Sequence, residues 1–309
     1  MTRIYIASKG DRAGLAALFR AALPDAEVMI DPSEFGDRPV SFAVVGRPDP
    51  GTLAAIPGLE VVLSLNAGVE HLLSSGEVPD GMPIVRMVDD GLAAGMTEWV
   101  AAQVMAWHRN ILPYVRLQAK GTWSPFREKL ASERIVTVLG AGALGRPAAE
   151  LLAHIGFQTR VWSRTARPVA GATSFGGPDG LRDAVDGADV LVNLLPLTEQ
   201  TRDLIDGPLL TAMAKGGLLV NGARGAHVVD ADLLAALDSG QLSLAALDVF
   251  RTEPLPSADP LWSHPAVLVS PHVAAPTHPA PAVAEMAANV RRYLAGQPMH
   301  NVVDRNAGY

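Results

Sequence analysis

The sequence predicts an α/β protein with two domains, each built on a parallel β-sheet. Short apolar runs rich in Val, Ile and Leu alternate with helical stretches along nearly the whole chain, the pattern of parallel sheets covered by helices. The length of 309 residues is about twice that of a typical domain. Hydrophobic residues make up 49% of the chain and charged residues 18%, so a substantial core can be buried.

The first half of the chain begins with a strand at residues 3–8, which alternates in hydrophobicity and then turns polar. A helix is predicted over residues 14–23, because its apolar residues recur at helical spacing. Further strands are expected at residues 41–45, 60–64 and 84–88. A much longer helical pattern follows over residues 97–118 and contains a single proline, Pro113.

A second series of strands starts near residue 134, with helices between its members. We expect helices over residues 143–155 and 230–239, and a closing helix over residues 280–294. The predicted strands cover residues 135–139, 159–162, 190–194, 218–221, 244–247 and 267–270. Open α/β sheets bind ligands at the carboxyl ends of their strands, so the residues that follow these strands are candidates for one site.

Charge and cysteine content exclude several classes of function. The 25 Lys and Arg residues against 32 Asp and Glu residues give a net charge of −7, which argues against binding nucleic acid or an anionic membrane through bulk charge. The absence of cysteine excludes disulfides, a thiolate nucleophile and Cys-ligated metal, and we expect no metal site. The N-terminal segment has the pattern of a strand rather than a signal peptide, and no apolar run approaches the ~18 residues of a membrane span. We therefore expect a cytoplasmic protein without membrane contact.

A glycine motif directly follows the strand predicted at residues 135–139. Gly140, Gly142 and Gly145 have the spacing G-x-G-x-x-G, with Ala143 and Leu144 between the last two. In a dinucleotide-binding turn these glycines permit the tight turn, the approach of the pyrophosphate and close packing of helix on strand. An ordinary strand–helix turn is the alternative, but the order strand, turn, helix, strand favours a dinucleotide.

The end of the next strand indicates which dinucleotide binds. NAD sites usually place Asp or Glu there to bind the ribose 2′-hydroxyl. This chain has Trp162, Ser163, Arg164 and Thr165, with Arg167 nearby and no carboxylate. Hydroxyl and guanidinium groups suit the 2′-phosphate of NADP. We therefore expect NADP(H) in preference to NAD(H); the alternative is that the arginines are simply solvated.

Three later segments place polar residues just after predicted strands. Arg224, Glu253 and His272 follow three successive strands of the second series. Each of the three also has an alternative explanation without a functional role: a surface arginine, a solvated or capping carboxylate, and an ordinary loop histidine.

Together with the glycine motif, these segments resemble the D-isomer-specific 2-hydroxyacid dehydrogenase family, from about residue 63 to residue 294. Within that family the chain is most similar to glyoxylate/hydroxypyruvate reductases of the A type. The segments that carry this similarity are Met96-Thr-Glu-Trp, Leu194-Leu-Pro196, residues 231–240 and Pro260-Leu-Trp-Ser-His-Pro265.

The resemblance implies two Rossmann-like or flavodoxin-like domains with parallel sheets, the cofactor domain being inserted in the substrate domain. The substrate-binding domain would be discontinuous and flavodoxin-like, covering residues 1–96 and 277–309. The NAD(P)-binding Rossmann domain would cover residues 97–276. A homodimer is also implied, with Trp123 either reaching a partner subunit or anchoring its own loop.

The resemblance also implies roles for individual residues. Arg224, Glu253 and His272 match the family's catalytic arginine, glutamate and histidine. The residues expected to bind substrate are Ala67, Gly68 and Val69, through backbone N–H groups, together with Arg224 and His272. The residues expected to bind the cofactor are Gly140, Gly142, Ala143, Leu144, Gly145, Trp162, Ser163, Arg164, Thr165, Leu195, Pro196, Ala223, Asp248, His272 and Ala274.

These residue types suit the reduction of a 2-oxo acid. Arg224 offers a planar fork of donors that can bind the carboxylate and polarise the ketone, whose oxygen becomes negative during reduction. His272 can supply the proton as general acid, while Glu253 on its far nitrogen holds the tautomer and favours the charged ring. We therefore expect an NADP-preferring reductase of a small 2-oxo acid, glyoxylate or hydroxypyruvate first.

Two departures from the family's pattern concern the substrate. Asn66 stands where glycine is common, and Gly46 stands where A-type reductases tend to carry a tryptophan over the substrate. A dehydrogenase for a bulkier 2-hydroxy acid is therefore one alternative. A dinucleotide-sensing, corepressor-like binding protein is another, because this fold serves both purposes; the intact catalytic set argues against it.

Overall fold

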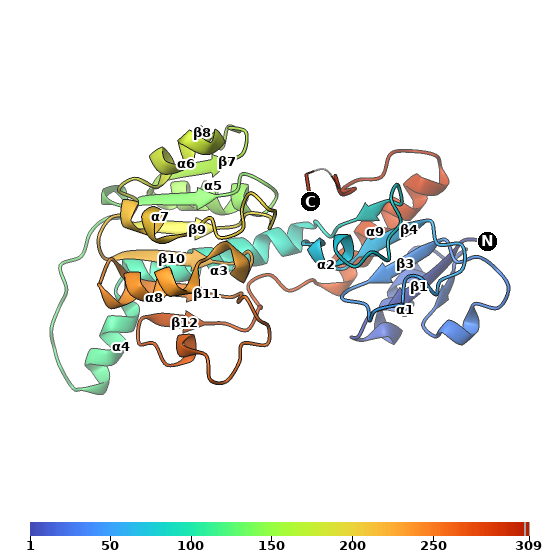
Figure 1. Cartoon of the computed structure of the whole chain (residues 1–309), viewed down its shortest axis with the longest axis horizontal. Helices are drawn as coiled ribbons and strands as arrows, with labels where there is room; N and C mark the ends of the chain where they lie inside the picture. The colour runs from blue at the N-terminus through green and yellow to red at the C-terminus, as the bar shows by residue number, and fades with distance from the viewer. Residues whose placement is uncertain (306, 309) are drawn as a thin grey trace. The chain divides into compact units, whose positions relative to one another are not determined.

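The computed structural model describes residues 1–305 and 307–308 of the chain (Figure 1). The chain divides into two compact units, one formed by Met1–Leu92 with Thr277–Tyr309 and the other by Ala93–Pro276. Each unit has one sheet whose strand pairs are parallel, which confirms the predicted α/β class with two parallel sheets. Within the described part of the chain, no helix is long and apolar enough to cross a membrane.

The sheet of the first unit has the strand order β2-β1-β3-β4-β5, which is the order of flavodoxin-like folds. Its strands are β1 (Arg3–Ala7), β2 (Glu27–Met29), β3 (Phe42–Val45), β4 (Val61–Ser64) and β5 (Ile84–Val85). Its helices are α1 (Arg12–Ala22), the 3-10 helix η1 (Pro32–Glu34), α2 (Glu70–Leu73) and α9 (Pro279–Leu294).

Both faces of this first sheet are buried, as expected for parallel strands. Ile4 and Ile6 of β1 belong to the core on one side of the sheet, and Tyr5 and Ala7 belong to the core on the other. A stripe of buried apolar residues on α9 packs into the first of these cores together with α1. The C-terminal segment thus completes the unit begun by the N-terminal strands.

The sheet of the second unit has the order β12-β11-β10-β9-β6-β7-β8. When β6 is counted as the first strand of this sheet, the order is the 3-2-1-4-5-6 of a Rossmann fold, with β12 as one more strand at the edge. The direction of strand addition reverses between β6 and β9. Its strands are β6 (Ile135–Leu139), β7 (Gln158–Ser163), β8 (Ala172–Gly176), β9 (Val190–Asn193), β10 (Gly217–Asn221), β11 (Leu242–Leu247) and β12 (Val267–Val269). Its other elements after residue 130 are η2 (Ala131–Glu133), α5 (Gly145–Ile155), α6 (Gly177–Val185), α7 (Gly207–Ala212), η3 (Gly225–His227), α8 (Asp230–Asp238) and η4 (Pro260–Trp262).

The single long helix predicted over residues 97–118 is wrong, because the structure has two helices there. α3 covers Asp90–His108 and α4 covers Ile111–Ala119, and Asn110 between them has a φ of 54°. Pro113 explains the break: it has no N–H to donate four residues back, and its ring clashes with that carbonyl. The proline therefore lies in the first turn of a new helix.

Candidate active site

The three residues predicted to be catalytic follow β10, β11 and β12 in the second unit. These three strands end in register, because the last residue of each is paired with that of the next: Asn221 with Leu247, and Leu247 with Val269. Backbone hydrogen bonds extend beyond the strand ends; the Ser270 N–H, for example, donates to the Leu247 carbonyl at 3.0 Å. The three segments therefore leave the sheet side by side at one edge.

His272 and Glu253 form a hydrogen-bonded pair. His272 Nδ1 lies 2.8 Å from Glu253 Oε2. The other carboxylate oxygen, Oε1, accepts the Phe250 N–H at 3.0 Å, which fixes the carboxylate. The His272 side chain is 42% exposed and that of Glu253 only 21%. The histidine can therefore meet a substrate through Nε2 while its carboxylate partner stays largely covered.

Asp248 holds the loop that carries His272. Its buried carboxylate accepts hydrogen bonds from Ser270 Oγ at 2.6 Å and from the N–H groups of Val273 and Ala274, both at 2.9 Å. Its carbonyl accepts the His272 N–H at 2.9 Å. Within this wrapped loop His272 has a φ of 56°, which is uncommon for a non-glycine residue. The residue predicted to contact the cofactor thus also places the histidine.

Arg224 follows β10 in an extended conformation. Its carbonyl accepts a hydrogen bond from Asn221 Nδ2 at 3.0 Å. The next residue, Gly225, packs so closely that a Cβ there would lie 2.0 Å from the carbonyl carbon of Phe250. Only glycine therefore lets the Arg224 loop contact the segment that leads to Glu253.

The glycine turn after β6 has the shape that a dinucleotide requires. Gly140 has a φ of 111°, and a Cβ on Gly145 would lie 1.8 Å from the Gly140 carbonyl oxygen. A Cβ on Gly142 would meet nothing within 4 Å, and Gly142 and Ala143 are exposed, so the backbone is open to a ligand. α5 begins at Gly145 and directs the positive end of its dipole toward the turn. The turn therefore fits a pyrophosphate.

The loop after β7 carries the residues predicted to select NADP. Trp162 is buried, and its indole N–H donates to the Gly177 carbonyl at 2.8 Å, which ties the end of β7 to the start of α6. Ser163 Oγ donates to the Thr165 carbonyl at 2.8 Å and turns the chain. Arg164 is exposed on this loop, where a guanidinium group can reach a phosphate.

The predicted carboxylate-binding loop, residues 67–69, lies between β4 and α2 of the first unit. The Asn66 carbonyl accepts the Met87 N–H at 3.0 Å. Thr277 Oγ1 donates to the Leu65 carbonyl at 2.9 Å. These bonds hold the base of the loop from two other segments of the unit.

Gly46 follows β3 and is bonded to the helix that follows this loop. His71 Nε2 lies 2.9 Å from the Gly46 carbonyl oxygen. A Cβ on Gly46 would meet only Ser8 Oγ, at 4.0 Å. A β-carbon therefore fits at this position without a close contact.

Comparison with known proteins decides the family. Residues 101–274 match the sequence model of the protein family described as D-isomer specific 2-hydroxyacid dehydrogenase, NAD binding domain. The chain is also 40% identical over 293 residues to glyoxylate/hydroxypyruvate reductase A of Serratia proteamaculans (strain 568), with 93% of each chain covered. The chain belongs to the D-isomer specific 2-hydroxyacid dehydrogenase family. The resemblance inferred from the motifs is thereby confirmed.

Solved structures of 2-hydroxyacid dehydrogenases share the fold. The enzyme from Xanthobacter autotrophicus Py2, in complex with NADPH and MES, has a TM-score of 0.93 and 36% identity, covering 100% of this chain and 99% of that one. An NADPH-dependent glyoxylate/hydroxypyruvate reductase from Sinorhizobium meliloti, in complex with NADP and sulfate, also has a TM-score of 0.93. Its identity is 34%, and the match covers 100% of both chains.

Three buried polar residues of this 2-hydroxyacid dehydrogenase were not expected at the site. Asn193, Asn221 and His227 are each at most 1% exposed and hydrogen-bond the loops that follow β9 and β10. The sequence could have indicated the two asparagines, since each is the last residue of an otherwise apolar strand. A polar side chain at that position is costly unless it is hydrogen-bonded.

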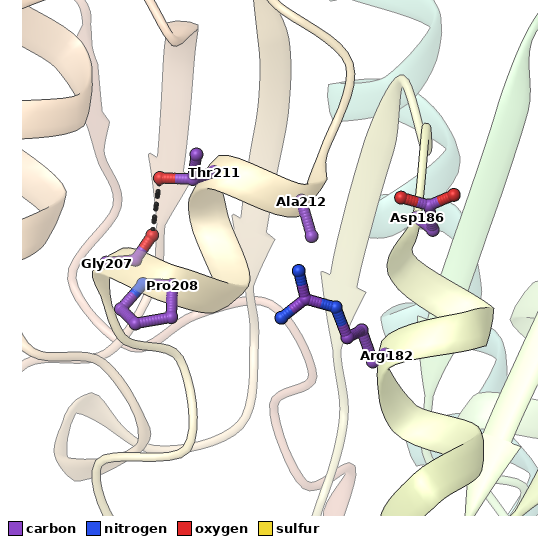
Figure 2. A pocket seen from close by; sticks show the side chains of 6 residues that line it. All are labelled: Arg182, Asp186, Gly207, Pro208, Thr211 and Ala212. Atoms are coloured by element: carbon purple, nitrogen blue, oxygen red, sulfur yellow. Dashed lines mark hydrogen bonds between the residues drawn. The ribbon is translucent and has the colours of Figure 1, made fainter.

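A separate surface hollow lies between the end of α6 and α7 (Figure 2). Its lining residues are Arg182, Asp186, Gly207, Pro208, Thr211 and Ala212. None of these is a predicted site residue of the dehydrogenase. Thr211 Oγ1 donates to the Gly207 carbonyl at 2.8 Å, a bond within α7 itself.

Proposed function

We propose that this protein reduces a small 2-oxo acid, glyoxylate or hydroxypyruvate, to the 2-hydroxy acid with NADPH. The observation that carries the proposal is the 2.8 Å contact between His272 Nδ1 and Glu253 Oε2, at the sheet edge from which the Arg224 loop also leaves. A positioned histidine–carboxylate pair can donate a proton, and an arginine on a neighbouring loop can bind the substrate carboxylate. The glyoxylate/hydroxypyruvate reductases to which the chain is similar support the choice of substrate.

The reaction balances as 2-oxo acid plus NADPH plus H⁺ giving 2-hydroxy acid plus NADP⁺. NADPH, held by the glycine turn at residues 140–145 and the 163–165 segment, would supply the hydride for the new C–H bond at the carbonyl carbon. Arg224 binds the carboxylate and stabilises the oxygen as it becomes negative. His272 Nε2 gives its proton to that oxygen, and Glu253 at Nδ1 keeps the ring oriented.

Residues 67–69 of the first unit are the proposed carboxylate-binding loop. Small residues at 67–69 allow the turn in which backbone N–H groups can converge on an anion.

NADP(H) is the proposed cofactor. The 163–165 segment offers hydroxyl and guanidinium groups and no carboxylate, and the glycine turn fits a pyrophosphate. Solved relatives from Xanthobacter autotrophicus, Sinorhizobium meliloti and Rhizobium etli were obtained with NADPH or NADP. This cofactor fits a cytoplasmic enzyme, as does the lack of cysteine.

A homodimer is proposed from the apolar surface of α4 and the segment after it. Trp123 is 97% exposed and Leu130 71% exposed, and Ile111, Val115 and Phe126 are exposed in the same region. Large exposed apolar residues gathered in one region mark an interaction surface. Sedimentation at micromolar concentration should give twice the chain mass, and Trp123→Ser with Leu130→Ser should shift the protein toward monomer.

The decisive experiment is a panel of NADPH-oxidation assays with glyoxylate, hydroxypyruvate, pyruvate and bulkier 2-oxo acids. We expect the highest kcat/KM for glyoxylate or hydroxypyruvate. Tight NADPH binding without turnover of any of these acids would contradict the proposal. A clear preference for a branched or aromatic 2-oxo acid would correct the substrate and keep the reaction.

A further inference from the structure

We propose that the buried side chains of Asn193 and Asn221 are positioning residues that lock the Arg224 loop to the loop after β9. The inference rests on the proposed function, because it concerns how the substrate-binding arginine is held. Both asparagines are the last residues of their strands and are paired in the register of β9 and β10. They are 0% and 1% exposed, so neither side chain is available to bind a ligand directly.

The two amides form one continuous chain of hydrogen bonds. Asn193 Oδ1 accepts the Leu195 N–H at 3.3 Å, and Asn193 Nδ2 donates to Asn221 Oδ1 at 3.0 Å. Asn221 Oδ1 also accepts the Ala223 N–H at 3.2 Å, and Asn221 Nδ2 donates to the Arg224 carbonyl at 3.0 Å. A residue predicted to bind the cofactor, Leu195, is thus connected through two side chains to the backbone of Arg224.

This network requires a donor and an acceptor on one side chain. Asn221 accepts through Oδ1 and donates through Nδ2 at the same time, which an ionised carboxylate, having no donor, cannot do. Because both groups are buried, a lost partner leaves an unsatisfied polar group rather than one solvated by water. The backbone of Arg224 is therefore held in one place relative to the Leu195 loop.

His227 lies between the same two loops. Its ring nitrogens Nδ1 and Nε2 lie 3.1 Å from the Arg224 carbonyl oxygen and 3.2 Å from the Pro196 carbonyl oxygen. The ring is completely buried, and a neutral ring has one N–H to donate to one of these carbonyls. The hydrogen bonds through Asn193 and Asn221 therefore join the two loops, at a place where a small displacement of a substrate clamp is costly.

The test uses Asn221→Asp and Asn193→Asp in the full-length protein, with Thr137→Val as the matched control. Thr137 is equally buried on β6 of the same sheet, and its Oγ1 donates to the Ala184 carbonyl at 2.5 Å, outside the network. The measurements are kcat/KM for glyoxylate, the affinity for NADPH, and the affinity of the NADPH complex for oxamate, a 2-oxo acid analogue that is not reduced. Thermal melts report folding.

Asn221→Asp should weaken oxamate binding and kcat/KM by about tenfold or more while NADPH affinity stays within a few-fold. Asn193→Asp should act in the same direction and less strongly, because it leaves the bond from Asn221 to Arg224 in place. If Asn221→Asp does not fold, the measurements on Asn193→Asp test the inference. Thr137→Val should lower the melting temperature without changing oxamate affinity.

Wild-type oxamate affinity in a folded asparagine variant would overturn this inference and leave the proposed function standing. An equal loss of oxamate affinity in Thr137→Val would also overturn it, by showing a general effect of a lost buried hydrogen bond. A wild-type protein that neither binds oxamate nor reduces any 2-oxo acid would overturn the proposed function, and the inference with it.

Discussion

His272 Nδ1 lies 2.8 Å from Glu253 Oε2, although 19 residues separate the two in the chain. Each partner is fixed by a further hydrogen bond: the histidine loop donates to the Asp248 carboxylate, and the glutamate accepts the Phe250 N–H. The contact therefore belongs to the fold of the second unit.

Glu253→Gln should lower kcat/KM for glyoxylate. The carboxylate bonded to His272 Nδ1 holds the ring for proton transfer through Nε2. A neutral amide forms a weaker bond to the ring than a carboxylate does, so the ring is held less firmly in the variant. Steady-state kinetics with glyoxylate and NADPH measure the change, with Glu150→Gln on α5 as a control. An unchanged kcat/KM would remove Glu253 from this role.

Arg224→Ala should lower kcat/KM for glyoxylate by ~10²–10³, because the clamp on the carboxylate and the stabilisation of the developing oxyanion are lost together. Arg224→Lys should lie between wild type and Arg224→Ala, since it keeps the charge but lacks the planar fork. Steady-state kinetics at saturating NADPH measure both variants. Near-normal kcat/KM in the alanine variant would show that another group binds the carboxylate.

Arg164→Asp should shrink or reverse the preference for NADPH over NADH. A hydrogen bond to a charged group contributes ~1.5–3 kcal/mol, and each 1.4 kcal/mol is about tenfold in affinity. The ratio of kcat/KM for the two cofactors should therefore fall by one to two orders of magnitude, mainly through KM. Arg182→Asp, an exposed arginine on α6, is the control. A wild type that prefers NADH would contradict the assignment.

Asp248→Asn should reduce kcat more than tenfold with little change in KM for NADPH. The carboxylate accepts hydrogen bonds from three donors of the His272 loop, and an amide directs its own N–H groups at some of them. Ser270→Ala removes one of the three bonds and should give a smaller effect in the same direction. If KM for NADPH rises while kcat is kept, Asp248 acts on the cofactor and not on the loop.

His108→Phe should weaken the loss of stability on acidification. Burial lowers the pKa of His108 most, and the nearby Arg134 and Arg109 charges lower it further. The unfolded chain then binds a proton near pH ~6.5 that the folded chain resists. The contribution of His108 to stability is present above that pH and is lost as the pH falls below it.

The measurement for His108 is the free energy of unfolding by urea at pH 8 and pH 5.5. The phenylalanine keeps an aromatic ring beside Phe157. In the wild type the rings of His108 and Phe157 pack edge to face with their centroids 5.1 Å apart. The difference between the two pH values should be smaller in the variant than in wild type. His154→Gln, on the exposed side of α5, should leave the difference unchanged. An unchanged difference in His108→Phe would refute the prediction.

Local spacing along the chain was sufficient for the parts of the site that lie within one strand–turn–helix unit. The glycine turn at Gly140, Gly142 and Gly145 is of this kind, because its shape depends on backbone freedom at fixed short intervals. The alternation of apolar runs and helical stretches likewise predicted the α/β class. The edge strands β2 and β8 were not predicted from that alternation, since one is only three residues long and the other is half-buried and mixed in polarity.

Other features depended on contacts between distant segments. The break at Asn110 could have been predicted from Pro113, whose effect on a helix is local. The pairing of His272 with Glu253, and the amide chain from Asn193 through Asn221 to Arg224, depend on the register of β9 to β12. The sequence by itself determined which residue types follow the strands, because that order is written along the chain. Only the tertiary structure decided which of them meet, because hydrogen bonds act over about 3 Å and the sheet alone brings such distant residues that close.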